Sequence, residues 1–210
     1  MYVGGRGYFD VALADAKFDK QQRTSFFALH NDDWLIFGLD SAFTSNKKDL
    51  FMKGDLNQEQ AEFVRSVRAE HQTQRVIILT HHDPITLQAK AFLPLYEQVL
   101  DALGGVAPDF WFYGHVHNGI VYKPDVLGSK TLFRCAGHGA IPYGATPDLE
   151  AAADVVEWYE SESARDPHRK VRLLNGFVAL TIDGKNLTES WISEQGDERW
   201  ARTYKPTTSA

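Results

Sequence analysis

The sequence predicts an α/β fold, because strand-like apolar runs alternate with helix-like segments through its central part. The run RVIILT at 75–80 is continuously apolar and rich in β-branched residues, as in a strand buried on both faces. A second apolar run, FWFY at 110–113, comes after a helix-like segment. This order of strand, helix and strand favours parallel neighbours joined by a right-handed crossover.

Composition and charge narrow the class of protein. The chain has 210 residues, 43% of them hydrophobic and 24% charged, which suits one soluble globular domain. A net charge of −6 argues against a nucleic-acid-binding face, which needs basic side chains. No apolar run is long enough to span a bilayer, and residues 1–9 lack the features of a signal peptide. With only Cys135, no internal disulfide can form, so we expect a cytoplasmic protein without membrane contact.

Further elements flank the central strands. Two strand-like runs at 25–30 and 33–40 are separated by turn-forming residues and predict a hairpin. The next segment predicts a helix with Asn57 as its N-cap and Gln60 as the capping-box partner. A second helix is predicted over 90–103 from its apolar spacing.

The C-terminal half predicts a more antiparallel arrangement. Strand candidates lie at 119–124, 130–137, 176–184 and 188–194. The acidic stretch at 148–166 predicts a surface helix inside an insertion that covers 138–168. Residues 204–210 are expected to form a flexible tail.

Histidines come directly after both central strands, at the point where each strand ends. His81 and His82 come after the first strand, and His115 and His117 come after the second. Parallel strands deliver these side chains to one sheet edge, which is where ligands bind in open α/β sheets. Neutral imidazole binds divalent transition metals well, so we predict a metal site at this edge. On an extended backbone, His115 and His117 would face the same side.

Other polar residues near this edge admit two interpretations each. Asp83 either orients a ligand histidine or fixes the turn before Pro84, and we favour the turn. Asp40 is expected to have a structural role, either as a cap or in hydrogen bonds to its own loop. His138, in a glycine-flanked loop, is expected either in a turn or on the substrate side of the same edge.

With these residues in view, the sequence resembles the calcineurin-like metallophosphoesterases. The stretches ILTHHDP at 78–84 and YGHVHN at 113–118 resemble the last two metal-binding motifs of that family. The runs at 34–43 and 54–64 are similar to the segment that precedes them. The resemblance implies part of a four-layer αββα sandwich with mixed sheets. It also implies a metal-dependent hydrolase of phosphomonoesters or phosphodiesters.

The family pattern assigns roles to the histidines. His81 and His115 would bind one divalent ion and His117 a second, with manganese, iron or zinc as the expected metals. His82 would lie beside the site, behind the ligands or facing the substrate, where it has the catalytic role. His138 would contact the small phosphorylated substrate.

The first three motifs of the family are absent upstream of His81. They carry the bridging aspartate, an asparagine ligand and an acid histidine, while residues 1–9 resemble the family segment that comes after the third motif. The chain is therefore expected to be a single, N-terminally truncated domain over 1–210, so the true start and any signal peptide would precede Met1. We expect impaired hydrolysis and self-association through an exposed sheet edge. The alternative is a non-catalytic remnant that acts as an interaction module or as a complementing subunit.

Overall fold

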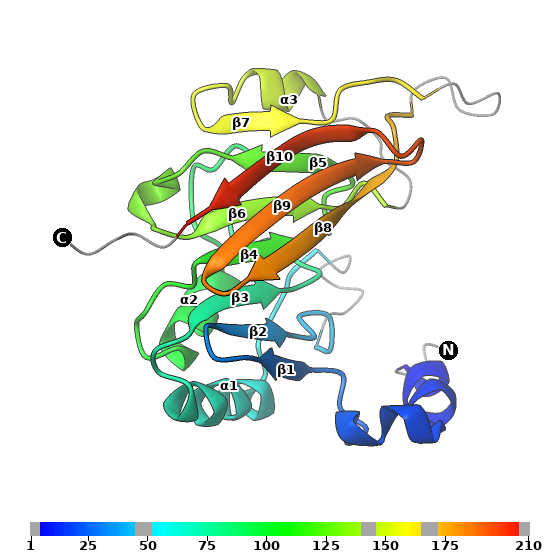
Figure 1. Ribbon diagram of the computed structural model, residues 1–210, viewed down its shortest axis with the longest axis vertical. Coiled ribbons are helices and arrows are strands. Elements are labelled where there is room, and N and C mark those ends of the chain that lie inside the picture. Colours follow the sequence, from blue (N-terminus) through cyan, green and yellow to red (C-terminus); the bar gives the residue numbers. More distant parts are fainter. Residues whose placement is uncertain (1–4, 45–51, 140–145, 165–171, 206–210) are drawn as a thin grey trace.

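The computed structural model describes residues 5–44, 52–139, 146–164 and 172–205, and it confirms the α/β fold. A seven-stranded mixed sheet has the order β1-β2-β3-β4-β6-β5-β7, and a three-stranded sheet has the order β10-β9-β8 (Figure 1). The strands are β1 (Phe27–His30), β2 (Trp34–Gly38), β3 (Arg75–Leu79), β4 (Phe110–Tyr113), β5 (Gly119–Tyr122), β6 (Leu132–Ala136), β7 (Val156–Tyr159), β8 (Gly176–Asp183), β9 (Asn186–Ser193) and β10 (Glu198–Tyr204). The helices are α1 (Gln58–Glu70), α2 (Pro94–Ala102) and α3 (Thr146–Glu150).

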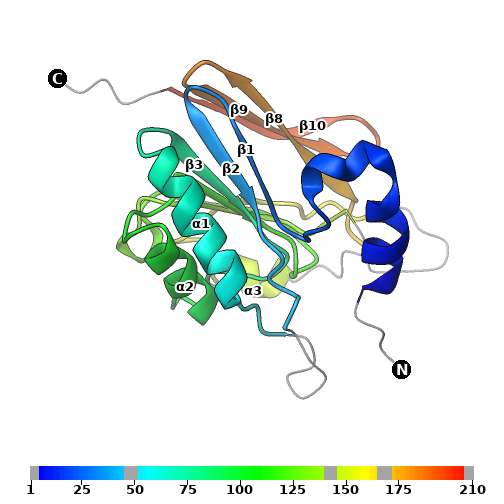
Figure 2. The same cartoon turned by 90° about the horizontal axis from the view of Figure 1, so that it is seen from below.

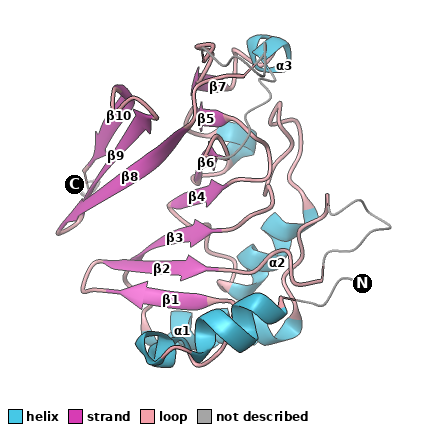
Figure 3. Ribbon diagram, turned by 90° about the vertical axis from the view of Figure 1, so that its right-hand side faces the viewer, coloured by secondary structure: helices cyan, strands magenta, loops and turns pink. Residues whose placement is uncertain are grey.

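Parallel strands form the middle of the large sheet, as the apolar runs predicted. β2 pairs with β3, β3 with β4, and β4 with β6, all in parallel. β1 closes one side as the predicted antiparallel hairpin partner of β2, while β5 and β7 are antiparallel on the other side. The arrowheads of β2, β3 and β4 therefore point to one edge of the sheet (Figure 3).

Different elements pack on the two faces of the large sheet. Helices α1 and α2 lie on one face, and the small sheet lies across the other (Figure 2). Alternate residues of β3 divide accordingly: Val76 and Ile78 pack in the core under the helices, and Ile77 packs with Leu187 of the small sheet. The described residues thus form a layer of helices and two sheets. No helix among them is long and apolar enough to cross a membrane.

Helix α1 begins directly after the predicted N-cap Asn57, but Gln60 does not act as the predicted capping-box partner. The Asn57 side chain accepts a hydrogen bond from the Gln60 backbone N–H at 2.9 Å. The Gln60 side chain does not return the capping-box bond. It is buried and bonds both the N–H and the carbonyl of Asp40, at 2.8 and 3.0 Å. Asp40 bonds its own loop as expected, since its Oδ1 accepts from the Ala42 N–H at 3.1 Å.

Helix α2 is shorter than predicted because it starts at Pro94 rather than near residue 90. Proline suits the first turn of a helix but biases the residue before it toward an extended backbone. Leu93 accordingly has φ −99° and ψ 158°, and Phe92 forms an antiparallel bridge with Ile85. The stretch before α2 is therefore a closed loop that returns toward the end of β3.

The predicted surface helix at 148–166 is wrong over most of its length. Only the short helix α3 lies in the described part of that stretch, and β7 comes after it as an edge strand that pairs with β5. The β-branched and aromatic residues of β7 favour a strand, and β5 offers an open edge. Residues 140–145 and 165–171 of the expected insertion, and 206–210 of the expected tail, lie outside the described residues. Strand β10 was not predicted.

A buried ion pair joins the two sheets. Arg134 of β6 donates from Nε to both carboxylate oxygens of Glu189 on β9, at 2.8 and 2.9 Å, and both side chains are fully buried. Tyr204 of β10 accepts from Arg134 at 2.6 Å and donates to Glu189 at 2.7 Å. The buried charges of Arg134 and Glu189 need these partners, because an unpaired buried charge strongly destabilises the folded state.

Candidate metal site

The loops after β3 and β4 run side by side beyond the sheet. The Thr80 N–H donates to the Phe112 carbonyl and the Gly114 N–H donates to the His81 carbonyl, both at 3.0 Å. The parallel pairing therefore continues past the ends of the strands. This arrangement sets His81 against His115, although 34 positions separate them in the sequence.

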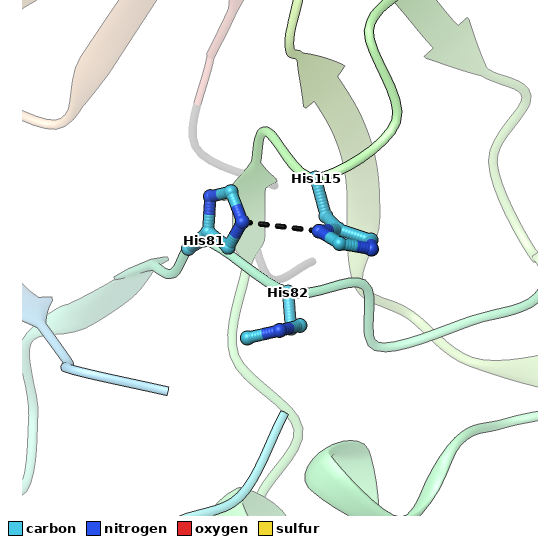
Figure 4. Close-up of side chains that lie close together, drawn as sticks. All are labelled: His81, His82 and His115. Atoms are coloured by element: carbon cyan, nitrogen blue, oxygen red, sulfur yellow. Dashed lines mark hydrogen bonds between the residues drawn. The ribbon is translucent and has the colours of Figure 1, made fainter. Parts of the chain in front are cut away.

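Three histidines converge at this edge, as Figure 4 shows for His81, His82 and His115. One ring nitrogen of each lies within 4.8 Å of the others. Nδ1 of His115 lies 3.0 Å from Nε2 of His81, and the ring centres of His82 and His115 are 4.9 Å apart. Imidazole nitrogens are suitable ligands for zinc, manganese and iron, so this donor set fits a divalent ion.

The neighbouring histidines His81 and His82 have different surroundings, as adjacent positions predict. His81 is the more exposed of the two and only partly covered, whereas His82 is buried with 2% of its surface accessible. Ser41 holds His82 twice, because its Oγ accepts from the His82 backbone N–H and bonds Nδ1, each at 3.0 Å. Nδ1 of His82 is thus engaged by the protein.

His117 does not belong to this group of three. The backbone bends through 115–118 instead of staying extended. The prediction that His115 and His117 face the same side of an extended backbone is therefore wrong. His117 still lies near enough that its charge lowers the pKa of both His81 and His115. Its role as a ligand of a second ion stays a prediction.

The cluster favours neutral imidazoles. Burial, and after it the charges of its histidine neighbours, lowers the pKa of His115 to about 4. Burial and the charges of His82 and His117 also lower the pKa of His81. A metal ligand must be an unprotonated imidazole, so these rings are ready for a cation near neutral pH.

His138 lies beside the site with its ring turned inward. It is 2% exposed and stacks on Trp191, with ring centres 5.5 Å apart. Burial lowers the pKa of its imidazole to about 4. The ring also fits against Gly119 and Gly176, where a Cβ would approach it to 3.0 and 2.6 Å. This side chain packs between the two sheets. The substrate contact expected for His138 stays a prediction.

Asp83 comes directly after the histidine pair and is largely buried. Burial raises the pKa of its carboxyl to about 7, while a hydrogen bond from the Val116 backbone opposes this rise. That bond ties Asp83 to the loop carrying His115. Its role in the turn before Pro84 stays a prediction.

Several residues that shape the site are not marked by any pattern in the sequence. Met52 places its sulfur 3.2 Å from Nε2 of His115, and Ser41 holds His82. Gly137 comes after β6 and lies under the His115 loop, where a Cβ would come within 1.8 Å of the Val116 carbonyl oxygen. Only the glycines around His138 hinted at such a close approach.

The fold and this site define an α/β protein with a histidine cluster at the carboxyl edge of its parallel strands. No family model matches the chain, and no curated protein matches it. Among solved structures, it is similar to the protein described as "GAP50 the anchor in the inner membrane complex of Plasmodium". That match has a TM-score of 0.51 and 11% identity, and it covers 87% of this chain and 54% of that one. The chain thus spans about half the length of that structure, and the likeness shows the fold alone.

Proposed function

We propose that the chain carries the histidine part of a metallophosphoesterase site and belongs to a metal-dependent phosphoester hydrolase. The observation that carries this proposal is the convergence of His81, His82 and His115 from two parallel strands, with their ring nitrogens within 4.8 Å. The sequence motifs around these histidines resemble those of the calcineurin-like family. The residue pattern and the geometry of the same histidines both support this proposal.

His81 and His115 are the ligands proposed for one ion. Two ligands on a tetrahedral zinc, each about 2.0–2.1 Å from the metal, lie roughly 3.3 Å apart. The observed separation of 3.0 Å between Nε2 of His81 and Nδ1 of His115 is close to that value. His117 is the ligand proposed for a second ion, and His82 is proposed to face the substrate.

The proposed activity of this chain alone is low. When bound, divalent ions in such sites stabilise the charge of the phosphoryl group and activate water. Among the described residues, the group able to hold a metal contains three histidines and no carboxylate. Neutral ligands offset the charge of a pair of cations poorly, so we expect weak metal binding and little or no turnover. Manganese, iron and zinc remain the proposed metals, and a small phosphate ester remains the proposed substrate.

A non-catalytic role is the second candidate. The similar solved structure is described as an anchor, so a protein of this fold has a described role other than catalysis. β8 ends the small sheet in the described part of the chain, and Phe177 on it is 57% exposed. An unpaired edge with an exposed aromatic residue suits pairing with a second copy or with another chain.

Metal content and hydrolysis, measured on the same purified protein, separate these candidates. The assay uses 4-nitrophenyl phosphate and bis(4-nitrophenyl) phosphate with manganese or zinc, and sedimentation velocity reports the oligomeric state. Metal binding with slow hydrolysis, both lost in His115→Ala, supports the hydrolase. Self-association without metal binding supports the interaction module and overturns the hydrolase.

A further inference from the structure

A groove of about 380 Å³ lies between the edge strand β1 and helix α1. β1 is the outer strand of the large sheet, and α1 lies close to it (Figure 1). The floor of the groove is apolar and consists of Phe26, Ala28, Phe63 and Val67. Its volume falls within the range of about 300–1,000 Å³ that binding pockets occupy. Among the described residues, none lines both this groove and the histidine cluster.

The outer edge of β1 offers backbone groups for pairing. The Asn31 N–H donates to the Trp34 carbonyl at 3.0 Å, at the end of the ladder between β1 and β2. Hydrogen-bonded pairs alternate in an antiparallel ladder, so Leu29 also bonds β2. The backbone N–H and carbonyl groups of Ala28 and His30 therefore point away from β2. No strand in the described part of the chain pairs with this edge.

Both faces of β1 leave apolar surface for an added strand. Ala28 has a small side chain on the groove face, where Phe63 and Val67 of α1 pack against the core. Side chains alternate along a strand, so Leu29 lies on the opposite face, and it is 59% exposed. A strand added beside β1 would therefore bury apolar side chains on both of its own faces.

The two ends of the groove carry opposite charges. Lys20 lies near the start of β1, where the side-chain amide of the next residue in the chain donates to the Phe26 carbonyl at 3.2 Å. Glu70 lies at the other end, where His71 stacks on His30 with ring centres 4.1 Å apart. Within the described ranges, neither Lys20 nor Glu70 has an ion-pair partner. Both charges are therefore available to a bound chain.

We propose that this groove binds an extended peptide segment of a partner protein, which adds an antiparallel strand to the outer edge of β1. Such a strand begins beside His30 and ends beside the start of β1. A basic residue at its beginning would face Glu70, and an acidic residue at its end would face Lys20. Apolar residues between them would enter the groove. In this mode of recognition, backbone hydrogen bonds provide affinity and side-chain pockets provide specificity. The inference does not depend on the proposed function, because the histidine cluster takes no part in it.

Two capped peptides of the same composition, KVTVTE and EVTVTK, test the charges. Six residues cover β1 and one residue at each end. Each peptide is titrated into the full chain, and backbone amide signals in NMR spectra follow binding. KVTVTE should shift the signals of Ala28, His30 and Val67. It should bind about fivefold more tightly than EVTVTK, because both of its charged residues lie opposite a groove charge of the other sign. No shift of these three signals with either peptide would overturn the inference.

Backbone methylation distinguishes strand addition from apolar contact alone. In the proposed arrangement, the two valines lie opposite Ala28 and His30, so their N–H groups donate to β1. Methylation of both valine nitrogens should weaken binding by about tenfold or more, because two hydrogen bonds are lost. Methylation of both threonine nitrogens leaves these bonds in place and should change the affinity by less than about twofold. Equal losses from the two methylations would contradict strand addition.

A charge reversal in the protein tests the direction of the strand. Lys20→Glu should abolish the preference for KVTVTE over EVTVTK, because each peptide then has one favourable and one unfavourable contact. Lys130→Glu makes the same change outside the groove and should preserve the preference. Urea denaturation checks that both variants fold. An undiminished preference in folded Lys20→Glu would overturn the antiparallel direction.

A second copy of the chain is the competing occupant of this edge. If two copies pair through β1, the signals of Ala28 and His30 should move with protein concentration, and sedimentation velocity should show a dimer. That result would overturn the peptide site. Constant positions of both signals in the absence of peptide are expected and would support it.

Discussion

Nδ1 of His115 lies 3.0 Å from Nε2 of His81, across the ends of two parallel strands. Without a metal, one of these nitrogens must carry the hydrogen that the other accepts. The Gly114 N–H bond to the His81 carbonyl fixes the two loops at this distance. A cation must displace the shared hydrogen, which can move to the other nitrogen of its own neutral ring, so zinc binding near neutral pH should release no proton from this pair.

Gly137→Ala should disturb this pair from outside it. The new Cβ would meet the Val116 carbonyl oxygen at 1.8 Å, so the loop carrying His115 must move. We expect a loss of about 2 kcal/mol in the free energy of unfolding and weaker zinc binding. Gly7→Ala is the control, because a Cβ there meets nothing within 4 Å. Urea denaturation and zinc titration measure the two effects. Native values for both in Gly137→Ala would contradict the proposed support of the loop.

Glu189→Gln should destabilise the contact between the two sheets. The change leaves Arg134 fully buried without its carboxylate, at a cost of about 3–5 kcal/mol. Asp101→Asn breaks an exposed pair with Arg65 and should cost less than about 1 kcal/mol. Chemical denaturation compares both variants with the native chain. A loss in Glu189→Gln no larger than that in Asp101→Asn would refute the structural role of the buried pair.

Stability should decrease as the pH is lowered, because of His138. Burial lowers the pKa of its imidazole in the folded chain to about 4, against 6.5 when unfolded. As the pH falls below 6.5, the unfolded chain therefore binds the proton first. This difference removes up to about 3 kcal/mol of stability by pH 4. His138→Gln lacks the effect, so its unfolding free energy should change less between pH 7 and 4. Parallel curves for both proteins would show that His138 does not titrate as described.

Strand type and histidine convergence were predictable because both depend on short-range patterns. A short, continuous apolar run that is rich in β-branched residues, such as 75–79, favours a buried strand over a buried helix. Once two such strands are parallel, the residues after them must meet at one edge, which brought His81 and His115 together. The prediction needed no knowledge of distant contacts.

Other features depend on partners far away in the sequence. Gln60 satisfies the backbone of Asp40 instead of its own helix end, and β7 forms because β5 leaves an edge open. The Arg134–Glu189 pair joins positions 55 residues apart. The bent loop at 115–118 packs closely over Gly137, a contact that no local pattern around His117 reveals.

Zinc binding tests the central claim most directly. Isothermal titration of the native chain should show zinc binding, and His81→Ala and His115→Ala should each weaken it by about tenfold or more. His30→Ala removes a histidine outside the cluster of His81, His82 and His115 and should leave the affinity unchanged. Equal zinc affinity in all four proteins would contradict the assignment of this edge as a metal site.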